Sequence, residues 1–399
     1  MTSSSSLPSS NFSRTTLWAL IVFAAITPML LLVAPVVASQ LGHQLGLSAS
    51  QIGTYFFVEL GAFSAAALPS WLWLGKVDGR RVGVIAAVIF IAGNIATASL
   101  MPGFAGLLAL RAITALGGGT LNVLCMTSAA KSGNRDRVYG LWVIGQLVLG
   151  ATGTLVFPFL FDRFGLRVMY IASAVLALCA TPLISGFAST STDATATKRE
   201  KQDTPGANTV VIPAMVVFGV FSFYIAIGGV WTFASKAAVS AGLHAEGTGT
   251  VLAFASIMGI AGSSCASMFG GRIARSIMLA TGYAILTVAL LGLTAQGSLI
   301  GFVASVLAFK FAWTFVLPSI MAATADHDRT GRLVASLNLI IGSGLAIGPL
   351  LAGRLLDSGM SLEVLFMLAA GISVVSGIVL FRVERSERPL LRSVEVQAS

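Results

Sequence analysis

The sequence predicts an all-α integral membrane protein of twelve transmembrane helices, arranged as two pseudo-symmetric six-helix bundles with both termini in the cytoplasm. Three observations carry this prediction: the sparse charge, the apolar runs, and the distribution of Lys and Arg. Hydrophobic residues make up 56% of the 399 residues and charged residues only 10%, whereas soluble domains carry about 25% charged residues. Because so few charges cannot cover a water-facing surface, lipid must surround most of the chain.

The apolar runs set the number of helices. A helix of roughly 20 apolar residues spans a bilayer, and only a helix satisfies the backbone of a single segment in lipid. Twelve such runs occur, at approximately 16–38, 50–74, 82–100, 103–128, 138–160, 166–187, 209–233, 247–269, 276–294, 297–322, 331–354 and 362–382. We therefore predict a cytoplasmic tail over 1–15, a bundle over 16–187, a cytoplasmic linker over 188–208, a second bundle over 209–382, and a cytoplasmic tail over 383–399.

The basic residues set the orientation. With the N-terminus in the cytoplasm, 18 Lys and Arg residues fall on the cytoplasmic side and 4 on the outer side, which is the bias of the positive-inside rule. The same scattering excludes a nucleic-acid partner despite the net charge of +9, because such partners need clustered cations. We expect a multi-pass protein of a bacterial inner membrane.

The two predicted bundles share short sequence matches. Residues 51–54 (QIGT) open the second run, and residues 247–250 (GTGT) open the eighth, at an offset of 196. In the fifth and eleventh runs, Gly153 aligns with Gly348 and Asp162 with Asp357, at an offset of 195. Parallel repeats of this kind are typical of carriers that rock two halves about a site at the middle of the membrane.

Motifs for other functions are missing from the sequence. No GxxxxGK[ST] phosphate loop indicates ATP use, and no HExxH, GxSxG or Cys/His cluster indicates a catalytic site, a metal or a cofactor. A membrane-embedded enzyme would need a buried nucleophile or a His/Asp pair, and no predicted span contains His or Asp. A receptor would need a sizeable soluble domain, for which the tails and linker are too short. The expected energy source is an ion gradient or the solute gradient itself.

Three segments resemble motifs of a known transporter family. Residues 75–81 read GKVDGRR, residues 110–119 read LRAITALGGG, and residues 344–353 read GLAIGPLLAG. Together with the six-plus-six layout, they resemble the major facilitator superfamily over nearly the whole chain. The first is similar to a shortened form of the loop between spans 2 and 3, and the second to the arginine motif of span 4. The third is similar to an antiporter motif, but it lies in span 11 instead of span 5, so it does not indicate antiport.

The resemblance implies roles for four residues. Asp78, Arg80 and Arg81 would form the latch that helps family members switch conformation; alternatively, these charges only set the topology. Arg111 matches the span-4 arginine that many members associate with proton coupling. The glycines of span 11 serve either close helix packing or a hinge.

Three charged residues lie well inside predicted spans, and such residues mark solute or proton paths. At a rise of about 1.5 Å per residue, Glu59 and Arg111 are equally deep, so we predict a protonation-sensitive pair. A permanent structural salt bridge is the alternative. Lys310 has aromatic neighbours, including Trp313 at i+3, and no acidic partner in the spans. It therefore suits an organic anion; the alternative is a lysine that reaches interfacial water.

Five further side chains are candidates for the lining of a solute path. They are polar or aromatic residues inside predicted spans: Tyr224, Trp231, Gln146, Asn338 and Asn122. Tyr224 and Trp231 share a helix face because they are seven residues apart. For each of the five, a helix–helix packing contact is the alternative.

Together, these observations predict a secondary active transporter that moves a small organic solute by alternating access, coupled to protons. An organic anion is one candidate cargo. The alternative is a proton-driven efflux antiporter for drugs or metabolites. The expected partners are the solute, protons and the lipid bilayer, with no cofactor, and the expected state is a monomer.

Overall fold

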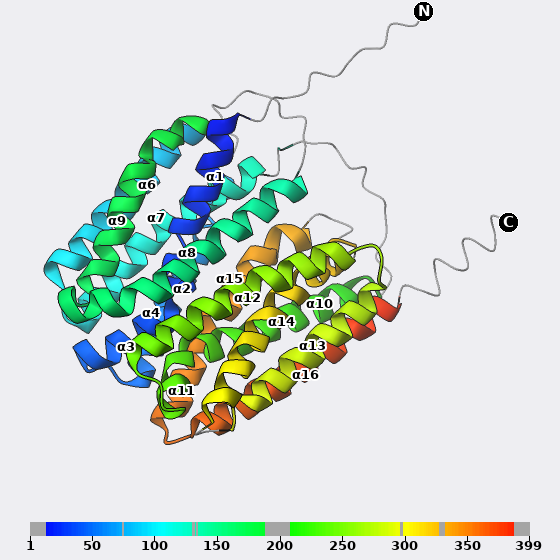
Figure 1. Ribbon diagram of the computed structural model, residues 1–399. Coiled ribbons are helices and arrows are strands. Elements are labelled where there is room, and N and C mark those ends of the chain that lie inside the picture. Colours follow the sequence, from blue (N-terminus) through cyan, green and yellow to red (C-terminus); the bar gives the residue numbers. More distant parts are fainter. Residues whose placement is uncertain are drawn as a thin grey trace, which may run out of the picture.

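The computed structural model describes residues 13–73, 76–129, 132, 135–187, 208–295, 298–326 and 332–386, and every regular element in these ranges is helical (Figure 1). The first set of helices, called the N-set, comprises α1 (Arg14–Ile26), α2 (Met29–Leu32), α3 (Ala34–Leu45), α4 (Ala49–Ala65), α5 (Ser70–Trp73), α6 (Gly79–Leu100), α7 (Phe104–Ala129), α8 (Arg135–Phe164), α9 (Arg167–Ala180) and the 3-10 helix η1 (Thr181–Gly186). The second, called the C-set, comprises α10 (Asn208–Thr232), α11 (Ala234–Ser240), α12 (Ala245–Phe269), α13 (Arg275–Gly292), α14 (Leu299–Asp326), α15 (Arg332–Asp357) and α16 (Leu362–Ser386).

Ten of the described helices are long and apolar enough to cross a membrane, and they match the third to twelfth predicted spans. The first two predicted spans are interrupted. Pro28 precedes α2 and Pro35 lies in the first turn of α3. The first span is broken there because a proline lacks the N–H that a continuous helix would need. In the second span, α4 ends at Ala65 and a turn leads to the short α5. The prediction of one uninterrupted spanning helix is therefore wrong for each of these two segments. The total of twelve spans stays a prediction.

Several predicted boundaries differ from the helices by a few residues. Helix α16 continues to Ser386, past the predicted start of the C-terminal tail at residue 383. Helix α1 begins at Arg14 and α10 at Asn208, just inside the predicted tail and linker. Residues 1–12, 188–207 and 387–399 lie outside the described part of the chain.

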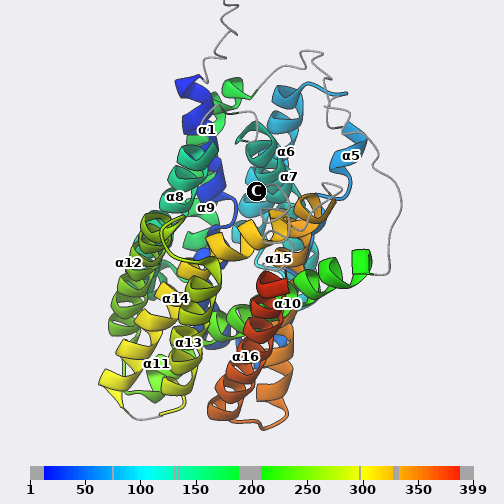
Figure 2. The ribbon, with the colours of Figure 1, turned by 90° about the vertical axis from the view of Figure 1, so that its right-hand side faces the viewer.

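The packing order of the N-set recurs in the C-set. Helix α1 contacts α8 as α10 contacts α15, and α4 packs on α7 as α12 packs on α14. Likewise, α6 packs on α7 and α9, and α13 packs on α14 and α16. Figures 1 and 2 show the two sets as separate groups of helices that lie side by side. The packing therefore follows the internal repeat found in the sequence.

Glycines bring the two sets together at their main contacts, α4 with α15 and α8 with α12. Gly53 of α4 lies against the backbone of Pro349 in α15, and Gly249 of α12 lies against the backbone of Thr154 in α8. A Cβ at either glycine would overlap the facing carbonyl group. Both glycines belong to the repeated 51–54 and 247–250 segments. The repeat thus conserves a close backbone contact that small residues permit.

Contacts between helix ends distinguish the two ends of the molecule. Near the start of α1, the Thr16 hydroxyl donates to the carbonyl of Gly186 at the end of η1, at 2.6 Å. In the C-set, Arg275 at the start of α13 pairs with Glu384 near the end of α16, at 3.2 Å. We call this the terminal end. The opposite end, where α3 contacts α11, is called the α3–α11 end.

The outside of both sets is apolar. Large side chains such as Val88, Ile171 and Val288 are exposed along α6, α9 and α13. Soluble monomers rarely expose so much contiguous apolar surface, whereas lipid-facing helices do so as a rule. The charged side chains buried inside the two sets are therefore the exceptions that need an explanation.

Candidate functional site

A buried ion pair joins α7 and α4 inside the N-set. Arg111 donates from Nε to Glu59 Oε2 at 2.8 Å and from Nη2 to Glu59 Oε1 at 2.6 Å. Its Nη1 donates to Asn94 Oδ1 of α6 at 2.9 Å. Only 2% of the surface of Arg111 and 5% of that of Glu59 is exposed. The planar guanidinium meets the carboxylate in the two-bond geometry that suits it best.

Two tyrosines complete this group of side chains. Tyr170 of α9 places its ring under the guanidinium, with Arg111 Cζ 5.0 Å from the ring centroid. Its hydroxyl shares a hydrogen bond of 2.8 Å with that of Tyr55, one helical turn before Glu59 on α4. We call Tyr55, Glu59, Asn94, Arg111 and Tyr170 the ion-pair cluster. Four helices thus contribute, and the charges are neutralised within the N-set.

The ion pair holds α4 and α7 together. Each oxygen of the Glu59 carboxylate accepts one hydrogen bond from the same arginine. Breaking a buried pair costs about 3–5 kcal/mol when one charge is left without a partner. The contact between α4 and α7 therefore depends on both charges.

The second buried charge is Lys310, in α14 of the C-set. Its Nζ lies 3.9 Å from the ring centroid of Trp231 in α10 and 3.9 Å from that of Trp313 in α14. The two indoles meet at 73°, and only 5% of the surface of Lys310 is exposed. Lys310 forms no ion pair with any carboxylate in the described ranges. We call Trp231, Lys310 and Trp313 the lysine cage.

The lysine cage also touches the N-set. Trp231 donates from Nε1 to the carbonyl of Leu31 in α2, at 3.1 Å. The residue four positions after Leu31 is Pro35, in the first turn of α3, which has no N–H to donate to that carbonyl. The interruption therefore provides the acceptor that links the cage to the other set.

The two buried cations lie in different sets of helices, Arg111 in α7 and Lys310 in α14. Each contact of Arg111 described above lies within the N-set. Lys310 contacts two tryptophans of the C-set instead. Glu59 and Arg111 meet as their equal depth predicts, and Trp313 lies beside Lys310 as its spacing predicts. The contact of Trp231 with Lys310 was not predicted. Nor were Tyr55, Asn94 and Tyr170 predicted to belong to the first group.

The other candidate lining residues have mixed surroundings. Gln146 of α8 donates to the carbonyl of Ala24 in α1, at 3.0 Å, which is a contact between helices of one set. Asn338 of α15 donates to Met126 Sδ of α7, across the two sets. Tyr224 of α10 is buried against Phe223 and Gly344. Asn122 differs, since its buried Oδ1 has no hydrogen-bond partner among the described residues.

The predicted latch connects two helix ends at the terminal end. Asp78 caps α6 by accepting from the backbone N–H of Arg80, at 2.9 Å. Arg80 Nε donates to the carbonyl of Phe187 after η1, at 3.1 Å. Arg81 is exposed. Arg80 thus joins the start of α6 to the end of the sixth span, whereas Asp78, in the described part of the chain, contacts only its own helix. Gly75 lies outside the described residues.

Sequence reasoning missed the contact that Asp357 makes at the α3–α11 end. Asp357, the last residue of α15, accepts from the Ser48 hydroxyl at 2.6 Å, from the backbone of Ser50 at 2.9 Å and from that of Ala49 at 3.0 Å. These donors form the start of α4, in the N-set. The alignment of Asp162 with Asp357 was the available signal, but one sequence cannot show which helix an end residue caps.

In the described ranges, no group of three or more His, Cys, Asp and Glu side chains could hold a metal ion. The chemistry of both buried groups is that of fixed charge, aromatic faces and transferable protons.

Comparison with known proteins agrees with the fold. Residues 17–329 match the family described as the Major Facilitator Superfamily. The Uncharacterized MFS-type transporter YbcL of Bacillus subtilis (strain 168) is 25% identical over 153 residues, which are 37% of this chain. The match spans only 38% of the length of that relative.

Solved structures share the architecture over most of the chain. A D-xylose-proton symporter has a TM-score of 0.71 at 14% identity, covering 92% of this chain and 95% of its own. An inward-facing, unoccupied bacterial homologue of the human lysosomal transporter Spinster has a TM-score of 0.70 at 15% identity, covering 94% and 98%. The nucleoside transporter NupG has a TM-score of 0.67 at 12% identity, covering 93% and 99%. At these identities, the likeness shows the fold alone.

The family match and the helical fold therefore show a multi-pass membrane transporter, not an enzyme. The chain belongs to the Major Facilitator Superfamily.

Proposed function

We propose that the chain is a secondary active transporter that carries a small organic anion by alternating access, coupled to protons through Glu59. The lysine cage carries the proposal. Lys310 is a buried cation between two indole faces, without a carboxylate partner among the described residues. A solute carboxylate is the simplest group that would neutralise it.

The two indole faces can hold Lys310 in the membrane and still leave its charge free to attract an anion. A lysine at the centre of a transmembrane helix costs about 2.5–3.5 kcal/mol on insertion scales. A desolvated cation–π contact contributes on the order of 2 kcal/mol. Two indole faces thus offset the cost without cancelling the charge. An entering carboxylate would gain the full attraction of a cation in surroundings of low polarity.

The cage also lies where a bound solute could act on the whole protein. Trp231 contacts Lys310 within the C-set and Leu31 in the N-set. An anion that draws Nζ away from the indole face would change a contact between the sets. Carriers with two repeated halves work by rocking those halves about a central site.

Coupling to protons is proposed for the ion-pair cluster. Glu59 is the one acidic side chain of that cluster, and its two oxygens face only Arg111 in the described contacts. The D-xylose-proton symporter, by its name, moves a sugar together with a proton. A proton on Glu59 in one conformation, released in the other, would link transport to the gradient.

The location and topology follow the distribution of basic residues. We propose twelve spans in a bacterial inner membrane, with the terminal end in the cytoplasm and the α3–α11 end outside. The 18-to-4 bias of Lys and Arg supports this orientation. The broken segments α1–α3 and α4–α5 would be the first two spans.

Counterflow in proteoliposomes tests the proposal. Vesicles that hold the purified protein would be preloaded with one member of a panel of aliphatic and aromatic carboxylates, or with an uncharged amide analogue, and labelled solute added outside. Wild type is expected to exchange carboxylates. Lys310→Gln is expected to abolish that exchange, because it removes the only charge of the cage. Lys310→Arg keeps the charge and is expected to retain part of the activity.

Lys236→Gln is the matched control, since Lys236 is exposed in α11. It should exchange solutes at the wild-type rate. Full carboxylate exchange by Lys310→Gln would overturn the role of the cage. A wild-type protein that moves only uncharged or cationic solutes would overturn the anion assignment while leaving transport itself intact.

A further inference from the structure

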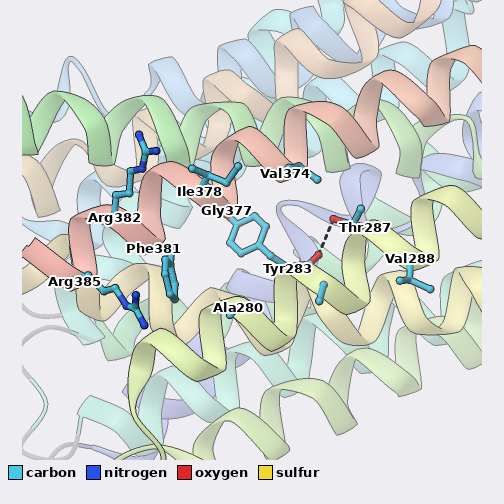
Figure 3. Close-up of a pocket in the computed structure, with 11 residues that line it drawn as sticks. Ala280, Tyr283, Thr287, Val288, Val374, Gly377, Ile378, Phe381, Arg382 and Arg385 are labelled. Carbon is cyan, nitrogen blue, oxygen red and sulfur yellow. Dashed lines mark hydrogen bonds between the residues drawn. The ribbon is translucent and has the colours of Figure 1, made fainter.

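A long groove runs along the lipid-facing side of the C-set, between α13 and α16 (Figure 3). Its volume is about 920 Å³. Small residues leave room for the groove. Ala280 and Ala284 line it from α13, and Gly377 lines it from α16. The groove is separate from the ion-pair cluster and from the lysine cage, and neither uses any of its residues.

The walls of the groove are suited to hydrocarbon. Its polar groups are already satisfied within the protein: Thr287 donates to the carbonyl of Tyr283 at 2.8 Å, and the Tyr283 hydroxyl pairs with Ser376 at 2.8 Å. Ser376 in turn donates to the carbonyl of Gly219 at 2.7 Å. The remaining lining includes Val288, Val374, Ile378 and Phe381. Apart from the two arginines at one end, the described lining offers a polar solute no free hydrogen-bond donor.

Two arginines stand at one end of the groove, at the terminal end of the molecule. Arg382 and Arg385 line it there and are both exposed. The Arg385 guanidinium lies over Phe381, with Cζ 4.7 Å from the ring centroid. The neighbouring carboxylate of Glu384 is paired with Arg275 at 3.2 Å. The local charge at this mouth is therefore positive.

We infer that this groove binds an anionic phospholipid, with an acyl chain along α13 and α16 and the phosphate of the headgroup at Arg382 and Arg385. The dimensions agree: from Val374 to Arg385 the groove extends roughly 16 Å at 1.5 Å per residue, about half of a hydrocarbon core of roughly 30 Å. Basic pockets between transmembrane helices on the cytoplasmic side are typical sites for anionic headgroups. The assignment to the cytoplasmic leaflet rests on the proposed orientation. The observation that an apolar groove ends at two arginines does not depend on that orientation.

Native mass spectrometry of the purified full-length protein tests this inference. The probes are dioleoylphosphatidylglycerol and dioleoylphosphatidylcholine, which share their acyl chains and differ in headgroup charge. Two arginines near an anionic headgroup correspond to a preference of roughly 30-fold for the anionic lipid. Arg382→Gln/Arg385→Gln is expected to bring the two lipids to nearly equal binding. An unchanged preference in that double variant would overturn the inference.

Two further variants distinguish lipid binding in the groove from attraction of the lipid by net charge alone. Arg163→Gln/Arg167→Gln removes two exposed arginines from the α3–α11 end and is expected to keep the wild-type preference. An equal loss in this control would show that net charge alone attracts the lipid. Ala284→Trp fills the groove and keeps both arginines, so it is expected to lower phosphatidylglycerol binding at least tenfold. Undiminished binding by Ala284→Trp, or displacement of the lipid by millimolar glycerol phosphate, would show an anion site without the groove. Melting temperatures of the variants close to that of wild type exclude misfolding.

Discussion

Arg111 and Lys310 are two buried cations that the protein accommodates in different ways. Arg111 has a carboxylate, an amide oxygen and a ring face as partners, all from its own set. Lys310 has two ring faces and no carboxylate in the described ranges. The planar guanidinium suits a fixed, bidentate pair, and the compact ammonium of lysine suits exchange of one partner for another. This difference supports a coupling role for the first group and a cargo role for the second.

Replacement of Glu59 by Gln tests the coupling role. Gln keeps the shape and one acceptor for Arg111 but cannot take up a proton, so net uptake driven by a pH gradient should be lost. Exchange of labelled for unlabelled solute needs no net proton movement and should persist. Both rates would be measured in the same proteoliposomes.

Glu246→Gln serves as the control, because Glu246 is an exposed glutamate in the first turn of α12. It should leave both rates unchanged. If Glu59→Gln accumulates solute against its gradient as wild type does, the ion pair is only structural. Ala at position 59 would be a poorer test, since an unpaired buried arginine costs about 3–5 kcal/mol of stability.

For single residues, the sequence predicts which charged side chains matter better than it predicts which residues surround them. Glu59, Arg111 and Lys310 are conspicuous because charge inside an apolar run is costly, and equal depth in two helices predicts the pairing of the first two. Tyr55, Asn94 and Tyr170 were not predicted, because neutral polar residues are common in spans and their neighbours depend on helix rotation. Trp231 and Trp313 were both candidates, but only the structure shows that they share one lysine.

Among the helices, the contacts α4–α15 and α8–α12 hold the two sets together. Gly53 faces Pro349 and Gly249 faces Thr154, at equivalent positions of the repeat. The sequence shows the repeat, but the role of its glycines can be recognised only when the facing backbone is known. The interruption of the first span had a visible signal in Pro28 and Pro35, but prolines occur in spanning helices when neighbours satisfy the backbone, so the sequence alone did not decide it.

Replacement of Gly53 by Val tests the contact between α4 and α15. The added side chain would overlap the carbonyl of Pro349, so the helices must separate, at a cost of about 1–3 kcal/mol. We expect a lower melting temperature and slower transport. Gly371→Val is the matched control, because a Cβ at Gly371 meets no atom within 4 Å. Equal behaviour of the two variants would contradict the close contact.

At the scale of the whole molecule, Asp357 joins α15 to the start of α4 at the α3–α11 end, and its counterpart in the repeat makes no such contact among the described residues. An acidic residue at a helix C-terminus is unfavourable for its own helix, and here it is compensated by three donors at the start of α4. The counterpart of Ser48 in the repeat is His244, whose side chain makes no capping hydrogen bond to α12. Asp162, the counterpart of Asp357, is exposed. The closure is thus asymmetric although the fold is pseudo-symmetric.

Asp357→Asn is therefore expected to loosen the α3–α11 end. Asn keeps one acceptor oxygen but loses the charge, and a hydrogen bond to a charged group contributes about 1 kcal/mol more than a neutral one. A change of 1 kcal/mol alters a two-state ratio roughly fivefold. Spin labels at His43→Cys of α3 and Lys236→Cys of α11, both exposed, would report the separation of the sets in a background without the 3 native cysteines. The distance distribution should shift towards longer separations. Asp162→Asn should leave it unchanged, because Asp162 makes no corresponding contact in the described ranges. A shift in both variants, or in neither, would mean that Asp357 does not hold this end closed.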